Sequence, residues 1–378
     1  MSAQTALAPW LQTQLETLLT QRGHAWLLSG PSGLGQFELA LALAKAWLCD
    51  APTAQGACGQ CGSCHSVEVH THPDLCMLMP EALCVSLGWP LDEKTEKELE
   101  KRKPSKEIKV DAAREAVAFT QFTRSRGNTK VVLVFPAERM NNITANTLLK
   151  TLEEPTGEIK FVLATEAAHQ LLPTIRSRCL GHTMRWPDFE DSLRWLQSQS
   201  ATPSEAPIST KPARDQPAAS KPEDLRVLLA GAGGRPEDVL AWVNGGASDT
   251  AARQWQALPK AMARGDVSAL ADWTPPLALD ALQKLCHDMW VVKVGGKPRF
   301  FSLADLPIQA PKPGTGQGAE LALPALQALP SASASSIFAM ATWAKELATA
   351  ARSVEHPYNP GLMLEAMVSR AKQALGTR

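Results

Sequence analysis

The segment Gly30-Pro-Ser-Gly-Leu-Gly-Gln-Phe37 decides the fold. It follows a short apolar run, Ala25–Ser29, which has the length and composition of a buried strand. It precedes Glu38–Leu48, where apolar residues recur at helical spacing. A glycine-rich turn between a buried strand and a helix is the position of a phosphate-binding loop, and Gly30 and Gly35 have its G-x-x-x-x-G spacing. The loop alone is also compatible with a plain strand-to-helix turn.

The loop lacks the side chains that act on a nucleotide. In a working loop a Lys reaches the β- and γ-phosphates, and the next residue, Ser or Thr, holds Mg²⁺. Gln36 and Phe37 stand at these two positions, and neither supplies a full positive charge or a magnesium ligand. Beyond the expected strand at 130–135, Glu138 is a lone acid where an adjacent acidic pair is expected. We therefore predict a degenerate loop (Gly30, Gly33, Gly35 and Gln36), with no bound ATP and no hydrolysis.

Three further apolar runs predict strands at 74–79, 130–135 and 161–165. A helix is predicted over 142–154, with Asn142 at its start and Pro155 just past its end. Strands that alternate with helices predict an α/β domain with a mostly parallel sheet covered on both faces. An all-α part follows this domain.

The second half of the chain reads as helices and loops. Residues 198–223 are rich in Pro, Ser and Ala and predict a flexible linker or loop. Two short helices are expected within 222–246, and residues 247–378 are expected to be helical. The best helical segments there are 277–294, 335–352 and 361–375, and the stretch 306–318 is expected to be a loop.

The composition excludes several classes of protein. The chain has 378 residues, which predicts two or three domains. Its 38 Lys and Arg balance 38 Asp and Glu, so there is no bulk attraction to nucleic acid or an acidic membrane. No export signal is visible, and the longest apolar run, 39–49, is too short to cross a bilayer. We expect a cytoplasmic protein with no membrane contact. The mixed charges of 92–109 predict a solvated helix or loop rather than a binding patch.

Four of the eight cysteines fall close together, which points to a metal rather than to disulfides. The predicted ligands of a structural zinc ion are Cys49, Cys58, Cys61 and Cys64. Four thiolates would fill the coordination sphere and leave no position for a catalytic water. Unligated thiols and an iron–sulfur cluster remain alternatives, and the nearby His65, His70 and His72 are alternative ligands. Cys76, Cys84 and Cys286 read as core or incidental thiols.

Two arginines, Arg176 and Arg178, follow the expected strand at 161–165. Each is open to two interpretations. They are either solvated surface charges, or one is an arginine finger, because a planar and always charged fork suits the stabilisation of a transferring phosphoryl group. A chain without a hydrolytic site of its own could use a finger only on a neighbour's nucleotide.

Together these motifs resemble the delta-prime subunits of bacterial DNA polymerase III clamp loaders, which belong to the AAA+ family. The resemblance is dense over about 20–185 and looser beyond. It rests on the degenerate loop, the four cysteines, 71–74, 130–134, 146–155, 161–165, Ser177-Arg-Cys179 and 356–360. The absent Lys together with the cysteine cluster separates delta-prime chains from the ATP-hydrolysing gamma/tau chains, which are otherwise similar.

The resemblance implies an architecture. An AAA+ core over 1–185 would contain the zinc-binding insertion 49–64. A helical lid over 186–246 would include the linker 198–223, and a helical collar over 247–378 would assemble a hetero-pentamer with gamma/tau and delta subunits. Arg178 would be the finger in a neighbour's ATP site, and Thr165 falls at the family's sensor position.

The resemblance also implies a function. The isolated chain would be no enzyme, but a subunit of the DNA polymerase III holoenzyme that helps to load the sliding clamp onto primed DNA. One alternative is an ATP-hydrolysing gamma/tau-like AAA+ ATPase, which would turn over ATP by itself. Another is a zinc-dependent DNA-binding module, which would bind DNA alone with a steep salt dependence.

Overall fold

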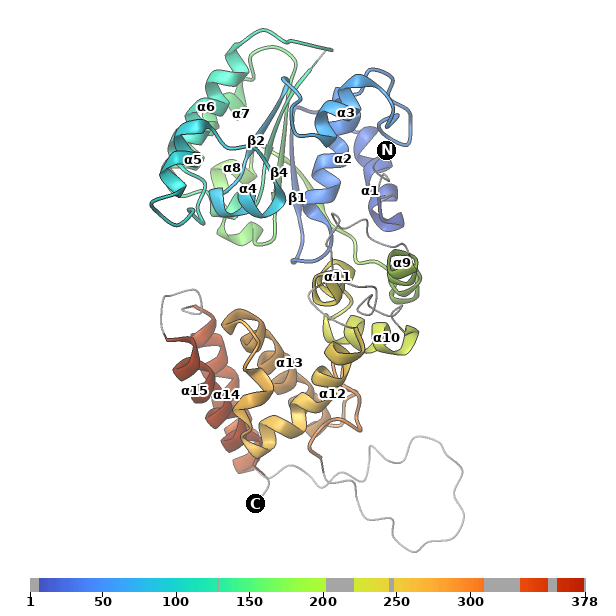
Figure 1. The fold of residues 1–378 in the computed structure, drawn as a ribbon, viewed down its shortest axis with the longest axis vertical. Coiled ribbons are helices and arrows are strands. Elements are labelled where there is room, and N and C mark those ends of the chain that lie inside the picture. The colour runs from blue at the N-terminus through green and yellow to red at the C-terminus, as the bar shows by residue number, and fades with distance from the viewer. Residues whose placement is uncertain are drawn as a thin grey trace, which may run out of the picture. The chain divides into compact units, whose positions relative to one another are not determined.

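A computed structural model describes residues 7–127, 129–201, 221–244, 248–308, 334–352 and 359–376. The chain divides into two compact units, Met1–Pro187 and Asp188–Arg378. The first unit contains the sheet, and the second is built of helices over its described residues (Figure 1). The predicted class, an α/β domain followed by an all-α part, is confirmed.

The sheet of the first unit has five strands in the order β2-β3-β4-β1-β5, and every neighbouring pair is parallel. The strands are β1 (Ala25–Ser29), β2 (Leu75–Leu78), β3 (Lys130–Val134), β4 (Ile159–Thr165) and β5 (Leu180–Thr183). The first four agree with the prediction. No sequence pattern predicts β5, because this edge strand is largely exposed and carries no apolar run.

Helices cover both faces of the sheet (Figure 1). On one side lie α1 (Pro9–Leu19), α2 (Gln36–Leu48) and α3 (Gly62–Glu68), and on the other lie α6 (Val110–Gln121) and α7 (Asn142–Glu153). Shorter helices are α4 (Glu81–Leu87), α5 (Glu93–Leu99) and α8 (Pro173–Arg176). Alternate strand residues face the two sides, so Val132 and Phe161 pack in the same apolar cluster as Leu148 of α7. This packing fixes the ends of α7 and β4, which carry the site.

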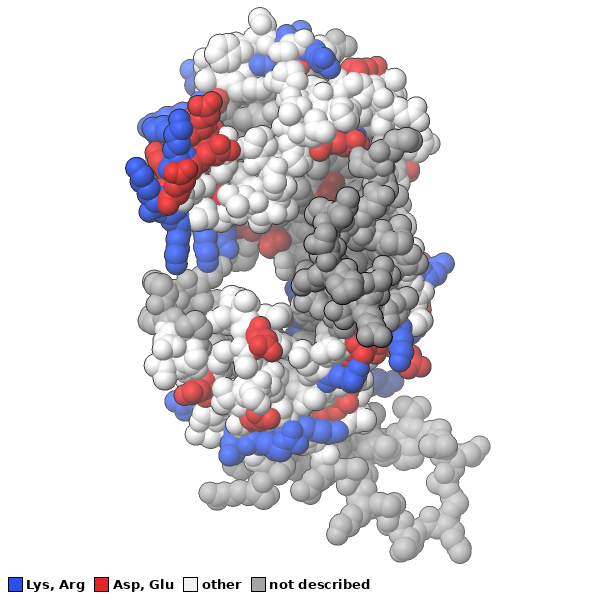
Figure 2. Space-filling model, viewed as in Figure 1, with Lys and Arg blue, Asp and Glu red and all other residues white. Residues whose placement is uncertain are grey.

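The charged segment 92–109 is exposed to solvent, as predicted, but ion pairs attach it to the rest of the first unit. No residue of α5 is buried, and two ion pairs join residues four apart, with Lys97 4.0 Å from Glu93 and Arg102 3.0 Å from Glu98. Figure 2 shows the two signs of charge gathered over this helix. The anchor is Glu81, whose side chain is only 9% exposed and which accepts hydrogen bonds of 2.6 and 2.8 Å from Arg102. Its other partners are the amine of Lys109 at 2.5 Å and the backbone N–H of Ser105 at 2.8 Å.

This anchor predicts a pH-dependent stability. The hydrogen bonds from Arg102, supported by Lys109, lower the pKa of Glu81 to about 2. A depressed carboxyl pKa stabilises the fold above the unfolded value, near 4.5, and the contribution is lost as the pH falls toward 2. Because Arg102 and Lys109 are partly exposed, we expect Glu81→Gln to cost about 2 kcal/mol at pH 7.

Urea unfolding at pH 7 and pH 3 measures this effect. The cost of Glu81→Gln should shrink by more than half at pH 3. The matched control is Glu98→Gln, which removes the exposed partner of Arg102 and should cost about 0.5 kcal/mol or less at either pH. An equal cost of Glu81→Gln at both pH values would contradict the argument.

The second unit contains α9 (Phe189–Ala201), α10 (Pro222–Gly231), α11 (Pro236–Asn244), α12 (Ser248–Arg264), α13 (Pro275–Lys293), α14 (Ala334–Ala351) and α15 (Pro360–Leu375). The helices predicted within 222–246, 277–294, 335–352 and 361–375 are confirmed. The predicted linker limits were too wide, because 198–201 belong to α9, 222–223 belong to α10 and Lys221 precedes α10 as its N-cap. Residues 202–220 lie outside the described residues. Most of the predicted loop 306–318 and of the motif 356–360 also lies outside them.

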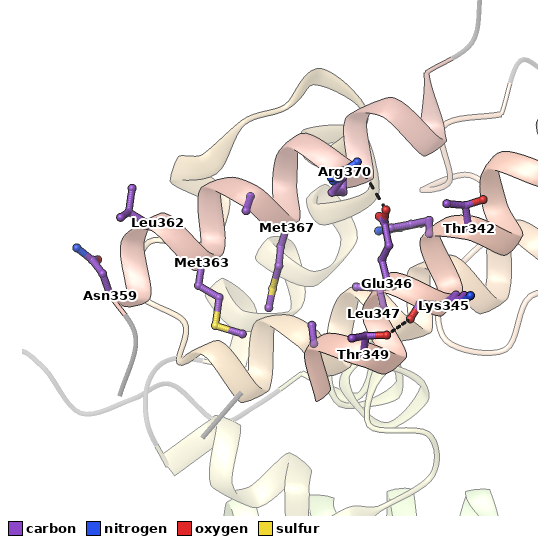
Figure 3. A pocket seen from close by; sticks show the side chains of 13 residues that line it. Thr342, Lys345, Glu346, Leu347, Thr349, Asn359, Leu362, Met363, Met367 and Arg370 are labelled. Atoms are coloured by element: carbon purple, nitrogen blue, oxygen red, sulfur yellow. Dashed lines mark hydrogen bonds and ion pairs between the residues drawn. The ribbon is translucent and has the colours of Figure 1, made fainter. Parts of the chain in front are cut away.

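Two apolar clusters hold these helices together. One unites α9, α10 and α11 through residues such as Leu196 and Leu229, and the other unites α12 to α15 through Trp255, Leu282 and Trp343. A groove of about 800 Å³ runs between α14 and α15, and Figure 3 shows side chains of both helices lining it. Among the described residues, no helix has the length and apolar character needed to cross a membrane.

Candidate functional site

The glycine loop between β1 and α2 adopts a backbone that only glycine tolerates well. Gly33 and Gly35 have positive φ angles of 76° and 87°. A Cβ atom on Gly35 would lie 2.6 Å from Cδ1 of Leu11 in α1. Gly33 and Gly35 therefore let the chain turn sharply between β1 and α2, and α1 packs closely against the turn.

The side chain of Gln36 is buried within this loop and bonds to its backbone. Its side chain is 2% exposed, and its Nε2 donates to the carbonyl oxygens of Gly30 at 2.8 Å and of Pro31 at 2.7 Å. Both amide N–H groups are thus spent on the loop's own backbone, at the position from which a Lys would reach a phosphate. The ring of Phe37 lies 5.2 Å from the ring of Phe135, so the magnesium-ligand position is occupied by an apolar contact.

The carboxyl end of β4 carries the second part of the site. The hydroxyl of Thr165, which is fully buried, donates to Oε2 of Glu138 at 2.7 Å. Oε1 of Glu138 accepts from the backbone N–H of Glu166 at 3.2 Å. Both oxygens of the lone acid are therefore engaged in holding the end of the strand.

Arg178 lies two residues beyond α8 and is held by two elements. Its Nε donates to Oε1 of Glu153 at 2.8 Å, one Nη also contacts Glu153, and the other Nη donates to the carbonyl oxygen of Thr174 at 2.7 Å. The side chain of Arg178 is 28% exposed. Arg176 is exposed at the surface. A fixed but accessible guanidinium of this kind can bind an anion from outside the chain.

The four predicted cysteines come together. Their sulfur atoms all lie within 4.8 Å of one another, with Cys49 and Cys61 3.8 Å apart and Cys58 and Cys64 4.0 Å apart. A tetrahedral zinc ion with Zn–S bonds of about 2.3 Å places its sulfurs about 3.8 Å from one another. The distances also exceed an S–S bond of about 2.05 Å. The geometry therefore fits four ligands of one metal ion.

Backbone groups support the cluster. The N–H of Cys58 donates to the sulfur of Cys49 at 3.3 Å, and the N–H of Cys64 donates to that of Cys61 at 3.4 Å. Backbone N–H groups of Gln60 and Cys61 lower the pKa of Cys58 to about 6, whereas burial raises the pKa of Cys64. Hydrogen bonds to sulfur favour the thiolate, which is the form that binds metal.

The alternative ligands lie outside this cluster, which among the described residues consists of cysteines alone. His70 stacks on Trp89 with ring centroids 3.8 Å apart, and Nδ1 of His72 accepts from the backbone N–H of Asp74 at 3.1 Å. Burial raises the pKa of the Cys84 and Cys286 thiols to about 11. Both cysteines are buried and lie outside the four-cysteine cluster, in agreement with their interpretation as core thiols.

Comparison with known proteins places the chain in a family. Residues 3–187 match the family described as "DNA polymerase III, delta subunit". The DNA polymerase III subunit delta' of Escherichia coli K12 is 30% identical over 281 residues, which are 73% of this chain and 76% of that protein. The chain belongs to the DNA polymerase III subunit delta' family. The subunit delta' of Pseudomonas aeruginosa is 39% identical over 230 residues, 60% of this chain and 58% of that protein.

Other DNA polymerase III subunits are also similar to the chain. The DNA polymerase III subunit tau of Escherichia coli is 30% identical over 174 residues, 46% of this chain and 23% of that protein. Among solved structures, a DNA polymerase III gamma subunit-related protein of Thermotoga maritima covers 97% of this chain and 99% of its own, with 15% identity and a TM-score of 0.45. The predicted resemblance to the delta-prime family is confirmed.

Two contacts of the site were missed by the sequence analysis. Glu153, in the quoted stretch 146–155, carried no role, and Glu138 was treated only as a misplaced acid. Their partners, Arg178 and Thr165, lie 25 and 27 residues away. The sequence held one hint of these contacts: Glu153 is close to the end of a predicted helix, and Glu138 follows closely after a predicted strand.

Proposed function

We propose that the chain is a non-hydrolysing member of the DNA polymerase III clamp loader, which helps to load the sliding clamp onto primed DNA in the cytoplasm. The observation that carries this proposal is the closure of the glycine loop by Gln36. A loop whose inner amide is bonded to its own carbonyls has no cation for a triphosphate. Membership of the delta' family supplies the complex in which such a chain works.

The domain organisation that we propose follows the two units. The AAA+ core spans 1–185 with the zinc-binding insertion 49–64, the lid spans 186–246, and the collar spans 247–378. Support comes from the division at Pro187 and from the two apolar clusters of the second unit, one centred on α9–α11 and the other on α12–α15. The proposed partners are gamma/tau and delta subunits in a hetero-pentamer, with clamp and primed DNA bound through the complex.

We propose a structural zinc ion held by the four cysteines. Four thiolates complete a tetrahedron, so the ion supplies folding free energy rather than an activated water. Cys49 follows the last residue of α2 and Cys61 caps α3, so the ion would join these two helices. The insertion 49–64 has few apolar residues of its own, which explains why it would need such a ligand.

We propose that Arg178 acts in trans as an arginine finger on ATP bound by a neighbouring subunit. Three properties support this role. The guanidinium is accessible, it is held by hydrogen bonds to residues of α7 and α8, and the chain's own glycine loop has no cation for a triphosphate on which it could act. A finger stabilises charge that develops on the transferring phosphoryl group. The isolated chain is accordingly no enzyme.

ATP turnover by the purified chain tests the proposal. We expect no hydrolysis above background, and Gln36→Lys should not create it, because Phe37 remains against Phe135 and Glu138 remains bonded to Thr165. A gamma/tau subunit measured in parallel is the positive control. Turnover by the unaltered chain at the rate of that control would favour the alternative, a hydrolysing gamma/tau-like ATPase.

A further inference from the structure

The guanidinium of Arg178 is gripped from two sides by elements distant in sequence. On one side Glu153, the last residue of α7, accepts from Nε at 2.8 Å and from one Nη. On the other side the carbonyl oxygen of Thr174, in α8, accepts from the second Nη at 2.7 Å. Two fixed acceptors define both the position and the plane of the fork.

The contacts with Glu153 and Thr174 leave part of the Arg178 guanidinium free to bind an anion from outside the chain. A guanidinium has five N–H donors. Those of Arg178 are directed at Glu153, at Thr174 and, at 3.4 Å, at the hydroxyl of Ser177, which accounts for four at most. At least one N–H is therefore available, on a side chain that is 28% exposed. Arg178 can therefore bind a phosphate oxygen while its hydrogen bonds to Glu153 remain in place.

Glu153 does not stabilise α7, the helix to which it belongs. A negative charge at the last residue of a helix faces the negative end of the helix dipole, which costs a few tenths of a kcal/mol. Its side chain is 47% exposed, so it contributes little to the core. The preceding residue, Leu152, is fully buried in the cluster beneath the sheet and holds this helix end in place. The carboxylate is thus an exposed group on a rigid support.

We infer that Glu153 is a positioning residue that holds Arg178 in the orientation in which it meets a neighbour's nucleotide. The inference rests on the proposed finger role of Arg178. A free arginine side chain loses about 2 kcal/mol of rotamer entropy when it is fixed. Because Glu153 and Thr174 fix the fork in the folded chain, little of that cost remains when the subunits meet. The opposite arrangement, a latch that keeps Arg178 away from the nucleotide, predicts the opposite result.

The test uses the reconstituted complex with clamp and primed DNA, in which the gamma/tau subunits carry Ala at their own matching arginines. Arg178 is then the sole finger supplied. We expect Glu153→Ala to lower the ATP turnover rate about tenfold. Glu153→Gln should restore most of the rate, because the amide oxygen still accepts from the guanidinium. The neighbouring exposed residue offers a matched control, Glu154→Ala, which should leave the rate unchanged.

A double variant separates positioning from a structural effect. If Glu153 acts only through Arg178, Glu153→Ala should have no further effect in an Arg178→Ala background. An unchanged or increased rate in Glu153→Ala, with Arg178→Ala still slow, would overturn the positioning role alone. An unchanged rate in Arg178→Ala would overturn the finger itself. An equal loss in Glu153→Gln and Glu153→Ala would show that the negative charge, not the orientation, matters, and would also overturn the inference.

Discussion

Cys61→Ser should release one zinc ion per chain and destabilise the first unit. The substitution is informative because serine preserves the local fold of the helix start. Cys61 caps α3 by accepting from the backbone N–H of Cys64, and a serine hydroxyl is itself a favoured N-cap acceptor. The variant therefore removes a metal ligand, whose sulfur lies 3.8 Å from that of Cys49, with little damage to the cap.

The expected loss is at least about 3 kcal/mol of unfolding free energy, because structural zinc sites supply more than this to the segments that bind the ion. Metal analysis and urea unfolding of protein purified under reducing conditions measure the two effects. Cys84→Ala is the control. It removes a buried thiol outside the cluster, so it should keep the zinc and cost about 1 kcal/mol. Unaltered protein that carries no zinc would contradict the metal assignment.

The parts of the fold that could be predicted are those with local signals. The strand-loop-helix around residues 25–48 and the helix before Pro155 carry apolar periodicity and turn residues in adjacent positions. The first helix, α1, also has such a pattern, since Leu11, Leu15 and Leu18 are buried on one face, but no helix was predicted there because the segment as a whole is polar. The edge strand β5 has no local signal, because its residues are largely exposed and its pairing with β1 is formed across the whole domain.

The candidate site likewise has features that the sequence predicts and features that it does not. The absence of a cation at Gln36 and the ligand spacing of the cysteines are visible in the sequence, since each depends on residues close together. The consequence at Gln36 is not visible, because which carbonyls its amide reaches depends on the loop's three-dimensional path. The pairs of Glu138 with Thr165 and of Glu153 with Arg178 depend on which strand and helix ends become neighbours. Such pairs follow from tertiary packing, not from spacing.

Arg178→Ala should nearly abolish ATP hydrolysis at the site that it faces. In the complex whose gamma/tau subunits lack their own matching arginines, we expect a fall of about 10³-fold, the size seen when a sole arginine finger is removed. In the complex with all other fingers present the loss should be partial. The fold should persist, because Arg178 is partly exposed and its main acceptors, the carboxylate of Glu153 and the carbonyl oxygen of Thr174, belong to exposed residues that water can solvate. Thermal unfolding of the purified chain checks this second expectation.

The nearby Arg176 provides the matched control for charge. It lies two residues away, is exposed, and closes α8, so Arg176→Ala removes the same charge from the same surface. If Arg178 acts only through a general positive potential, the two variants should lose activity to the same extent. If it acts as a directed fork, Arg178→Ala should be far slower than Arg176→Ala, and Arg178→Lys should not rescue it, because an ammonium lacks the planar pair of donors that Glu153 and Thr174 orient. A rate for Arg178→Ala equal to that of the unaltered complex would remove the finger and leave the chain with an architectural role alone.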